Sequence, residues 1–246
     1  MFKHLSRGVK RFWAALALLS VEMVIVVLLF VVAFSGFLYI ARRIFILNET
    51  ELDNSVFAFL QNHVSERNND VMMFFTFLGK HDFLIPANLV LIAYFLFIRK
   101  HKWHSIKIPA IALSSLGLMF LLKNFFNRPR PDIPLLFEAE GLSFPSGHAL
   151  MSVTFYGLLV YIVYRNIKHV SLRWLMISLL ILLIVIIGFS RIYLRVHYAS
   201  DVIAGFCVGF LWLAFCVWML NRMEKYSMRK LNKVVEQPPV PEKKTA

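Results

Sequence analysis

The sequence is poor in charged residues and in cysteine, and both shortages narrow the class of protein. Only 17% of the 246 residues are charged, whereas a soluble domain carries about 25%. A soluble globular domain is therefore excluded, and a hydrophobic content of 59% indicates an integral membrane protein. The two cysteines, Cys207 and Cys216, lie inside an apolar segment, which excludes the disulfide framework of a small secreted protein.

Acidic residues are also scarce. There are 14 of them against 27 lysines and arginines, which gives a net charge of +13. A basic chain can bind nucleic acid, but these cations flank apolar segments instead of forming a patch on a soluble surface. We therefore expect them to orient the chain in a bilayer and to contact lipid headgroups, with no nucleic-acid partner.

Six apolar segments approach the ~20 residues that an α-helix needs to cross a bilayer. They are 12–41, 82–98, 108–126, 148–164, 174–190 and 198–220. We predict an all-α fold in which residues 12–220 form a bundle of six transmembrane helices. A basic segment at 1–11 precedes the bundle, and a basic, proline-rich tail at 221–246 is expected to be disordered.

A polar stretch at 45–66 separates the first two spans. Within it, four apolar residues recur at a spacing of four: Leu52, Val56, Leu60 and Val64. This pattern is typical of an amphipathic helix, and we predict a short helix that lies on the outer membrane surface. A loop helix that covers the bundle and has no part in substrate binding is an equal alternative.

Lysine and arginine are divided unequally between the two sides of the predicted bundle. The N-terminal segment, the loops at 99–107 and 165–173 and the tail hold 18 of the 27, and the opposite side holds nine. The richer side is expected to be cytoplasmic, so both termini should lie in the cytoplasm.

The outer side carries three polar stretches where spans end or begin. They read KNFFNRPRP (123–131), SFPSGH (143–148) and SRIYLRVHYASD (190–201). Their cations are Lys123, Arg128, Arg130, Arg191 and Arg195. Such a cluster at one membrane boundary indicates a binding site for an anion.

Phosphate fits this cluster best. Pro145 suits the first turn of a helix, so the amides of Ser146, Gly147 and His148 should point freely toward a bound phosphate. Arginine offers a planar fork that matches phosphate oxygens, and lysine adds a point charge. For Arg128 and Arg195 we favour the simpler interpretation that they reach lipid headgroups.

Two histidines could supply the chemistry. His197 and Asp201 are four residues apart, which would place them on one face of a helix. A carboxylate that accepts from one imidazole nitrogen leaves the other nitrogen able to attack phosphorus. His148, on the opposing helix end, could protonate the departing oxygen. No carboxylate cage for Mg²⁺ is present in these stretches, so we expect neither a metal nor another cofactor.

These stretches resemble the three signatures of the type 2 phosphatidic acid phosphatase superfamily: K-x6-R-P, P-S-G-H and S-R-x5-H-x3-D. All three match without a gap, and the six-span layout fits nearly the whole chain. The resemblance implies that His197 is a nucleophile that forms a phosphohistidine, that Asp201 activates it and that His148 is the general acid. It also implies a set of phosphate-binding residues: Lys123, Arg130, Ser146, Gly147 and Arg191. The family needs no metal, and vanadate should inhibit.

Within the family, the chain looks most like bacterial membrane lipid phosphatases of the phosphatidylglycerophosphate phosphatase B type. This implies a bacterial cytoplasmic (inner) membrane, an active site on the extracytoplasmic side, and a lipid substrate such as phosphatidylglycerol phosphate or undecaprenyl pyrophosphate. No obligate protein partner is inferred. A lipid A phosphatase and a lipid phosphotransferase are alternatives, as is a lipid or anion transporter. A haloperoxidase is disfavoured by the spans. A GxxxG at Gly205 and Gly209 is expected to serve helix packing.

Overall fold

The computed structural model describes residues 21–132, 135–136 and 139–235, and all regular secondary structure in these ranges is helical. In chain order the elements are α2 (Val21–Phe45), α3 (Glu51–Gln61), α4 (Glu66–Leu78), α5 (His81–Ala93), the π-helix η1 (Tyr94–Ile98), α6 (Lys102–Phe126), α7 (Gly147–Asn166), α8 (Val170–Tyr193) and α9 (Ala199–Val235). The prediction of an all-α chain is confirmed.

Six helical segments are long and apolar enough to cross a membrane. They are Met23–Phe45, His81–Ile98, Trp103–Phe126, Gly147–Asn166, Val170–Tyr193 and Ala199–Arg229. Each overlaps one of the predicted spans, so the six-helix bundle is confirmed. The beginning of the first predicted span, at 12–20, lies outside the described residues, as does the segment 1–11. Every side chain from Met23 to Val32 is at least 40% exposed in the protein alone, which suits a surface in contact with lipid.

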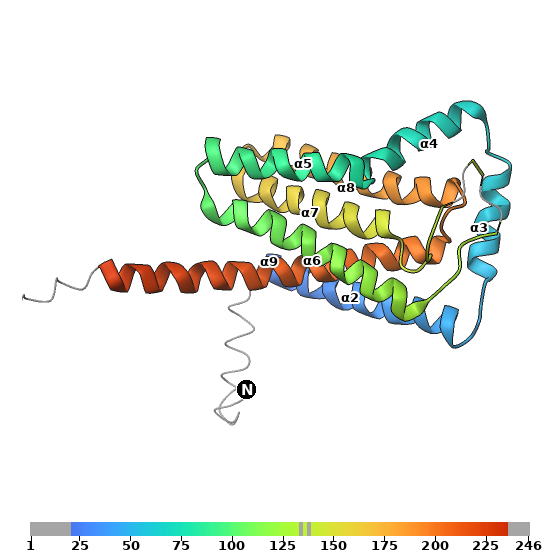
Figure 1. The fold of residues 1–246 in the computed structure, drawn as a ribbon, viewed down its shortest axis with the longest axis horizontal. Helices are drawn as coiled ribbons and strands as arrows, with labels where there is room; N and C mark the ends of the chain where they lie inside the picture. Colours follow the sequence, from blue (N-terminus) through green and yellow to red (C-terminus); the bar gives the residue numbers. More distant parts are fainter. Residues whose placement is uncertain (1–20, 133–134, 137–138, 236–246) are drawn as a thin grey trace, which may run out of the picture.

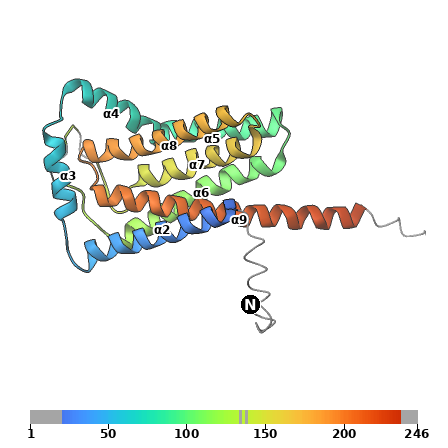
Figure 2. The same cartoon turned by 180° about the vertical axis from the view of Figure 1, so that it is seen from behind.

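Helix α7 lies at the centre of the bundle and packs against α6, α8 and α9 (Figures 1 and 2). Its approach to α9 is close because Gly205 and Gly209 have no side chain. A Cβ atom at Gly205 would lie 2.7 Å from the carbonyl oxygen of Ser146, and one at Gly209 would lie 2.9 Å from that of Leu150. The helix-packing interpretation of this GxxxG pair is therefore confirmed.

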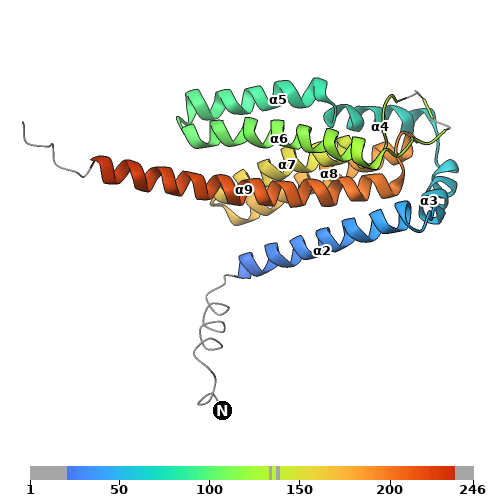
Figure 3. The same ribbon diagram turned by 60° about the horizontal axis from the view of Figure 1, so that its bottom comes forward.

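Helix α3 crosses one end of the bundle, next to the loop that follows α6 (Figures 1 and 3). It forms within the predicted 45–66 stretch, but its inward face differs from the predicted one. Asp53 and Leu60 are buried, whereas Leu52 is 45% exposed and Val64, beyond the end of the helix, is 38% exposed. The prediction from a spacing of four did not include Asp53. One face of a helix repeats every 3.6 residues, so residues at strict intervals of four gradually leave that face.

Helix α9 is longer than predicted. It does not end at Leu220 but continues to Val235 and projects beyond the other helices, on the side away from α3 (Figures 1 and 2). The prediction of disorder from residue 221 is therefore wrong for 221–235. This stretch contains neither glycine nor proline, and the first proline after it is Pro238, so nothing in it stops a helix. Residues 236–246 lie outside the described part.

The close contact of α7 and α9 predicts that Gly209→Ala destabilises the protein. The added methyl group would press on the backbone of α7, and such overpacking costs about 1–3 kcal/mol. Gly117→Ala is the matched control, because a Cβ atom there meets nothing within 4 Å. Thermal unfolding in detergent should show a lower midpoint for Gly209→Ala and an unchanged or higher one for Gly117→Ala. Equal midpoints for the two variants would contradict the close packing.

Candidate active site

The three polar stretches singled out in the sequence meet at the α3 end of the bundle. Lys123 lies in the last turn of α6, and its ammonium group donates to the carbonyl oxygen of Leu142, just before α7. Helix α6 ends at Phe126, and the residue that follows, Asn127, has a φ of 46° that turns the chain away from the helix axis. Asn tolerates this left-handed conformation better than most residues. The end of α6 and the start of α7 are thereby held side by side.

His197 and Asp201 form the predicted pair, although not on one face of a helix. Helix α9 begins only at Ala199, so His197 belongs to the turn that precedes it. Its Nδ1 lies 3.5 Å from Oδ2 of Asp201, and the two residues are 2% and 0% exposed. The backbone amide of Tyr198 donates to the same Oδ2 (3.0 Å). The turn, rather than the helix, therefore aims the ring at the carboxylate.

Ser143 joins this pair from the opposite side. Its hydroxyl lies 3.4 Å from Nδ1 of His197 and donates to Oδ2 of Asp201. Sequence reasoning quoted Ser143 as the first residue of SFPSGH but gave it no role. The only signal was its position two residues before the P-S-G-H motif, and that position says nothing about its partner 58 residues further along the chain.

Two arginines lie near His197, and one of them contacts its ring. The guanidinium of Arg130 donates through Nε to the carbonyl oxygen of Gly141 (2.9 Å) and through NH1 to that of Val196 (2.7 Å). The same NH1 lies 3.3 Å from Nε2 of His197. Arg191, only 4% exposed, donates to the hydroxyl of Thr76 in α4 (2.6 Å). Thr76 belongs to none of the three motifs, so it could not be predicted from the sequence as a partner of Arg191.

The environment keeps His197 neutral. Burial lowers the pKa of its imidazole from the usual 6.5 to about 3, although hydrogen bonding to Asp201 acts in the opposite direction. With Nδ1 directed at Asp201, the proton of the neutral ring belongs on Nδ1, and the lone pair is on Nε2, the nitrogen beside Arg130. Burial also lowers the pKa of Arg130, but an arginine side chain remains charged in proteins. The Nε2 lone pair of His197 thus faces the charged guanidinium group of Arg130.

The start of α7 differs from the prediction in one respect. Pro145 is not in the first helical turn, because the helix begins at Gly147 and Ser146 caps it by accepting from the amide of Ala149. The amide of Ser146 donates to the carbonyl oxygen of Asp201 (3.0 Å). The prediction that this amide points freely at a phosphate is therefore wrong. The Ser146 hydroxyl proton, by contrast, remains able to donate.

Gly147 and His148 open α7 beside the cations. A Cβ atom at Gly147 would lie 2.6 Å from Sδ of Met119 in α6, so this glycine allows the start of α7 to pack closely against α6, with Cε of Lys123 at an ordinary contact distance of 3.8 Å. His148 is the second residue of α7, and its ring lies beside Gly79 at the end of α4. All eight residues predicted to form the site are therefore found at the same end of the bundle.

Arg128 does not reach for lipid headgroups, as the sequence suggested. Its side chain is 8% exposed and donates to Asp201 Oδ1 (2.6 Å), Ser200 Oγ (2.8 Å) and Asp53 Oδ2 (2.9 Å). Its guanidinium carbon also lies 4.0 Å from the centre of the Tyr198 ring. By contrast, Arg195 makes no side-chain hydrogen bond within the described residues.

Asp53 connects α3 to this network. Besides Arg128, it accepts from the amide of Ser200 (2.9 Å) and from the Ser200 hydroxyl (2.7 Å), and it is only 2% exposed. Sequence reasoning missed it, although an acidic residue three positions before Val56 and seven before Leu60 lies on the apolar face of the helix. An acid on such a face is the signal that could have revealed it.

The assembled site is suited to a tetrahedral oxyanion. Within one small region it presents a neutral imidazole, three cations from two of the polar stretches and the amino end of a helix. The cations and the helix end favour negative charge. Across the ranges that the structure describes, no three His, Cys, Asp or Glu side chains gather in a way that would hold a metal ion.

Comparison with known proteins agrees with this geometry. The family model of the PAP2 superfamily matches residues 105–225. Phosphatidylglycerophosphatase B of Bacillus subtilis (strain 168) is 32% identical over 144 residues, which are 58% of this chain and 70% of that protein. Two crystal structures are similar. The first transmembrane PAP2 type phosphatidylglycerolphosphate phosphatase from Bacillus subtilis has a TM-score of 0.72 at 26% identity and covers 78% of this chain and 96% of its own.

The second structure is Aquifex aeolicus LpxE, with a TM-score of 0.53 at 28% identity over 66% of this chain and 93% of its own. The resemblance inferred from the three motifs is thus confirmed by independent means. With 32% identity over more than two thirds of a relative, and with the same helical architecture, this multi-pass membrane protein belongs to the PAP2 superfamily.

Proposed function

We propose that this protein is a membrane lipid phosphatase that removes the terminal phosphate of a lipid phosphate or pyrophosphate by way of a phosphohistidine. One observation carries the proposal: a buried, neutral His197 that is bonded to Asp201 turns its other nitrogen toward Arg130. Relatives whose names denote phosphatidylglycerophosphate phosphatases support a lipid phosphate as substrate.

Substrate binding in this proposal uses the cations and the start of α7. Lys123, Arg130 and Arg191 hold the phosphoryl oxygens, together with the amide of Gly147 and the hydroxyl of Ser146. We assign the hydroxyl of Ser146, rather than its amide, because that amide already donates to Asp201. These donors stabilise the negative charge on the equatorial oxygens as the transition state forms.

Phosphoryl transfer then takes place in two displacements. In the first, Nε2 of His197 forms a bond to phosphorus while the bond from phosphorus to the lipid oxygen breaks, and His148 gives that oxygen a proton. In the second, His148 takes a proton from water as the water oxygen attacks phosphorus, and the P–N electron pair returns to Nε2. Asp201 accepts a hydrogen bond from Nδ1–H throughout, stays ionised and stabilises the ring while it is cationic.

Arg128 and Asp53 act as positioning residues in this scheme. Asp201 is held at Oδ1 by Arg128 and at Oδ2 by Ser143 and the Tyr198 amide, so its carboxylate cannot rotate away from His197. Asp53 in turn fixes Arg128 from α3. The α3 helix is thus more than a cover, because it orients the proposed catalytic carboxylate through a chain of ion pairs.

The place of the site at the ends of spans supports a substrate that stays in the membrane. Lys123 is in the last turn of α6 and His148 is the second residue of α7, so a headgroup can reach both while its tails remain among lipids. We assign the phosphatase domain to 12–220, both termini to the cytoplasm and the site to the outer face of a bacterial cytoplasmic membrane, since 18 of the 27 lysines and arginines are on the side of the termini.

Loss of the proposed nucleophile is expected to abolish turnover. His197→Ala should lower phosphate release from phosphatidylglycerol phosphate by about 10³-fold or more, because no other group can form the intermediate. The matched control is His63→Ala, which removes an exposed histidine near α3. Near-normal hydrolysis by His197→Ala would contradict the mechanism. Lipid transport that survives in this variant would favour a transporter, and phosphate release only with an acceptor lipid would favour a phosphotransferase.

The proposed general acid predicts a dependence on the leaving group. His148→Ala should slow hydrolysis of a lipid alkyl phosphate by about 10²–10⁴-fold, since an alkoxide needs a proton to depart. A p-nitrophenyl phosphate ester departs without one, so its hydrolysis should fall much less. The measurement is the ratio of the two losses in kcat. An equal loss for both substrates would rule out His148 as the acid.

The positioning role of Asp53 predicts an effect on kcat at a distance from the phosphate. Asp53→Asn should lower kcat by about 10- to 100-fold, as small displacements of catalytic groups do, with little change in KM. Asp70→Asn, which neutralises an exposed acid in α4, is the control. Thermal unfolding should be recorded for both variants. A lower midpoint with unchanged kcat would show that Asp53 stabilises the fold without orienting Asp201.

A further inference from the structure

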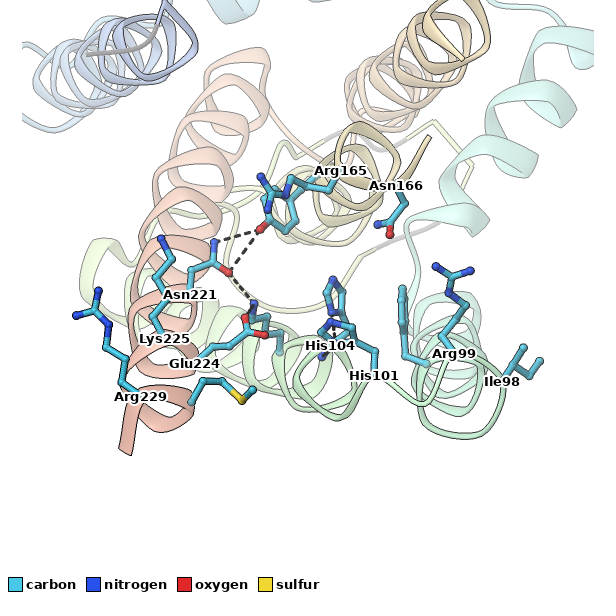
Figure 4. A pocket seen from close by; sticks show the side chains of 14 residues that line it. Ile98, Arg99, His101, His104, Arg165, Asn166, Asn221, Glu224, Lys225 and Arg229 are labelled. Atoms are coloured by element: carbon cyan, nitrogen blue, oxygen red, sulfur yellow. Dashed lines mark hydrogen bonds and ion pairs between the residues drawn. The ribbon is translucent and has the colours of Figure 1, made fainter. Parts of the chain in front are cut away.

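A second basic site lies at the other end of the bundle, far from His197. A cavity of about 960 Å³ opens there between η1, the start of α6, the end of α7 and α9 (Figure 4). Five cationic side chains line it: Arg99, Lys107, Arg165, Lys225 and Arg229. The volume is in the range of pockets that hold small molecules.

The charges in this cavity are not balanced. Glu224 is the one carboxylate among its lining residues. Lys107, only 4% exposed, donates to Glu224 Oε2 and to Asn221 Oδ1, both at 2.6 Å. Glu224 is therefore already paired, and no carboxylate among the described side chains pairs with the remaining four cations. A wall with four such charges favours an anion.

The start of α6 adds to the preference for an anion. His101 caps α6, a helix of 25 residues, so the positive end of that helix borders the cavity. Nδ1 of His101 lies 2.7 Å from Nδ1 of His104, and one of these nitrogens must donate to the other. The pair holds both rings at the cavity wall, as Figure 4 shows.

The location of the cavity indicates what the anion is attached to. One span ends at Ile98 and another at Asn166, and a third begins at Trp103, so the cavity lies where the bundle meets water. Part of its wall is apolar and accessible to lipid, since Ile98 is 71% exposed and Met228 is 47% exposed. A ligand with an anionic head and an apolar tail matches both parts of the wall.

We propose that this cavity binds the phosphodiester headgroup of an acidic phospholipid in the leaflet opposite the proposed catalytic site. The phosphate lies among Arg99, Arg165, Lys225 and Arg229, and the acyl chains leave past Ile98. The proposal does not depend on the phosphatase activity. It also gives the positive charge at this end of the chain a role beyond setting orientation: a specific lipid would hold the ends of α6, α7 and α9 together.

Lipid binding to the full chain tests the proposal. Native mass spectrometry of the detergent-solubilised protein would give the apparent Kd for dioleoyl phosphatidylglycerol and for dioleoyl phosphatidylcholine. We expect tighter binding of phosphatidylglycerol, and we expect Arg165→Gln/Arg229→Gln to weaken it by roughly 10- to 30-fold. The matched control is Lys168→Gln/Arg222→Gln, which removes the same charge from exposed positions on the same side but outside the cavity. This control should change the Kd by less than about 3-fold.

Further measurements distinguish a lipid in the cavity from one bound elsewhere on the protein. The loss of affinity in Arg165→Gln/Arg229→Gln, which leaves Lys123, Arg130 and Arg191 in place, distinguishes this lipid from one in the proposed catalytic site. Equal weakening by the two double variants would overturn the proposal, because it would show a general effect of surface charge. Equal affinity for the two lipids would also overturn it. Displacement of the lipid by millimolar glycerol 1-phosphate would show that a soluble phosphate ester is the ligand and would overturn the lipid assignment.

Discussion

The site depends on keeping the carboxylate of Asp201 charged and fixed where water does not reach it. Asp201 is 0% exposed, and a buried carboxylate is costly unless a cation and further donors compensate it. Arg128 supplies the cation, and Ser143 and the Tyr198 amide supply the donors. Its backbone carbonyl also accepts from Ser146, so a single residue joins the start of α7, the start of α9 and the loop after α6.

The need to compensate and fix the buried Asp201 carboxylate also explains why α3 packs across this end of the bundle. Arg128 carries one positive charge beside two carboxylates, and Asp53 reaches it from α3 while also bonding Ser200 at the start of α9. The network therefore links an extramembrane helix to the residues around His197.

The opposite end of the bundle is also basic, but it is organised differently. Its cations are mostly exposed and line a cavity, whereas Arg128 and Arg191 are buried with partners. In the proposed mechanism the α3 end fixes the reacting group, and in the proposed lipid site the opposite end receives a ligand from the membrane.

The membrane spans and most of the candidate site could be predicted from the sequence, because short continuous stretches of residues encode them. A span is a continuous apolar run, and each of the three motifs is a short string, so the bundle and the residues gathered at its α3 end could be predicted from the sequence. The interpretation of Arg128 failed because its partners are 72, 73 and 75 residues away, and no local pattern reports such contacts. The amide of Ser146 was misjudged for the same reason, since its acceptor belongs to α9. The tail beyond Leu220 was interpreted from its composition, although the prolines that suggest disorder come only after a stretch that forms a helix.

The most direct test of this account is to find the phosphate on the protein. The unmodified chain would be mixed with phosphatidylglycerol phosphate, quenched in alkali within milliseconds to preserve a P–N bond, digested, and mapped by mass spectrometry. We expect a phosphoryl group on His197, with ³¹P NMR assigning it to Nε2, and none on His148. A phosphoryl group on His148, or turnover with no phosphorylated residue at any quench time, would contradict it.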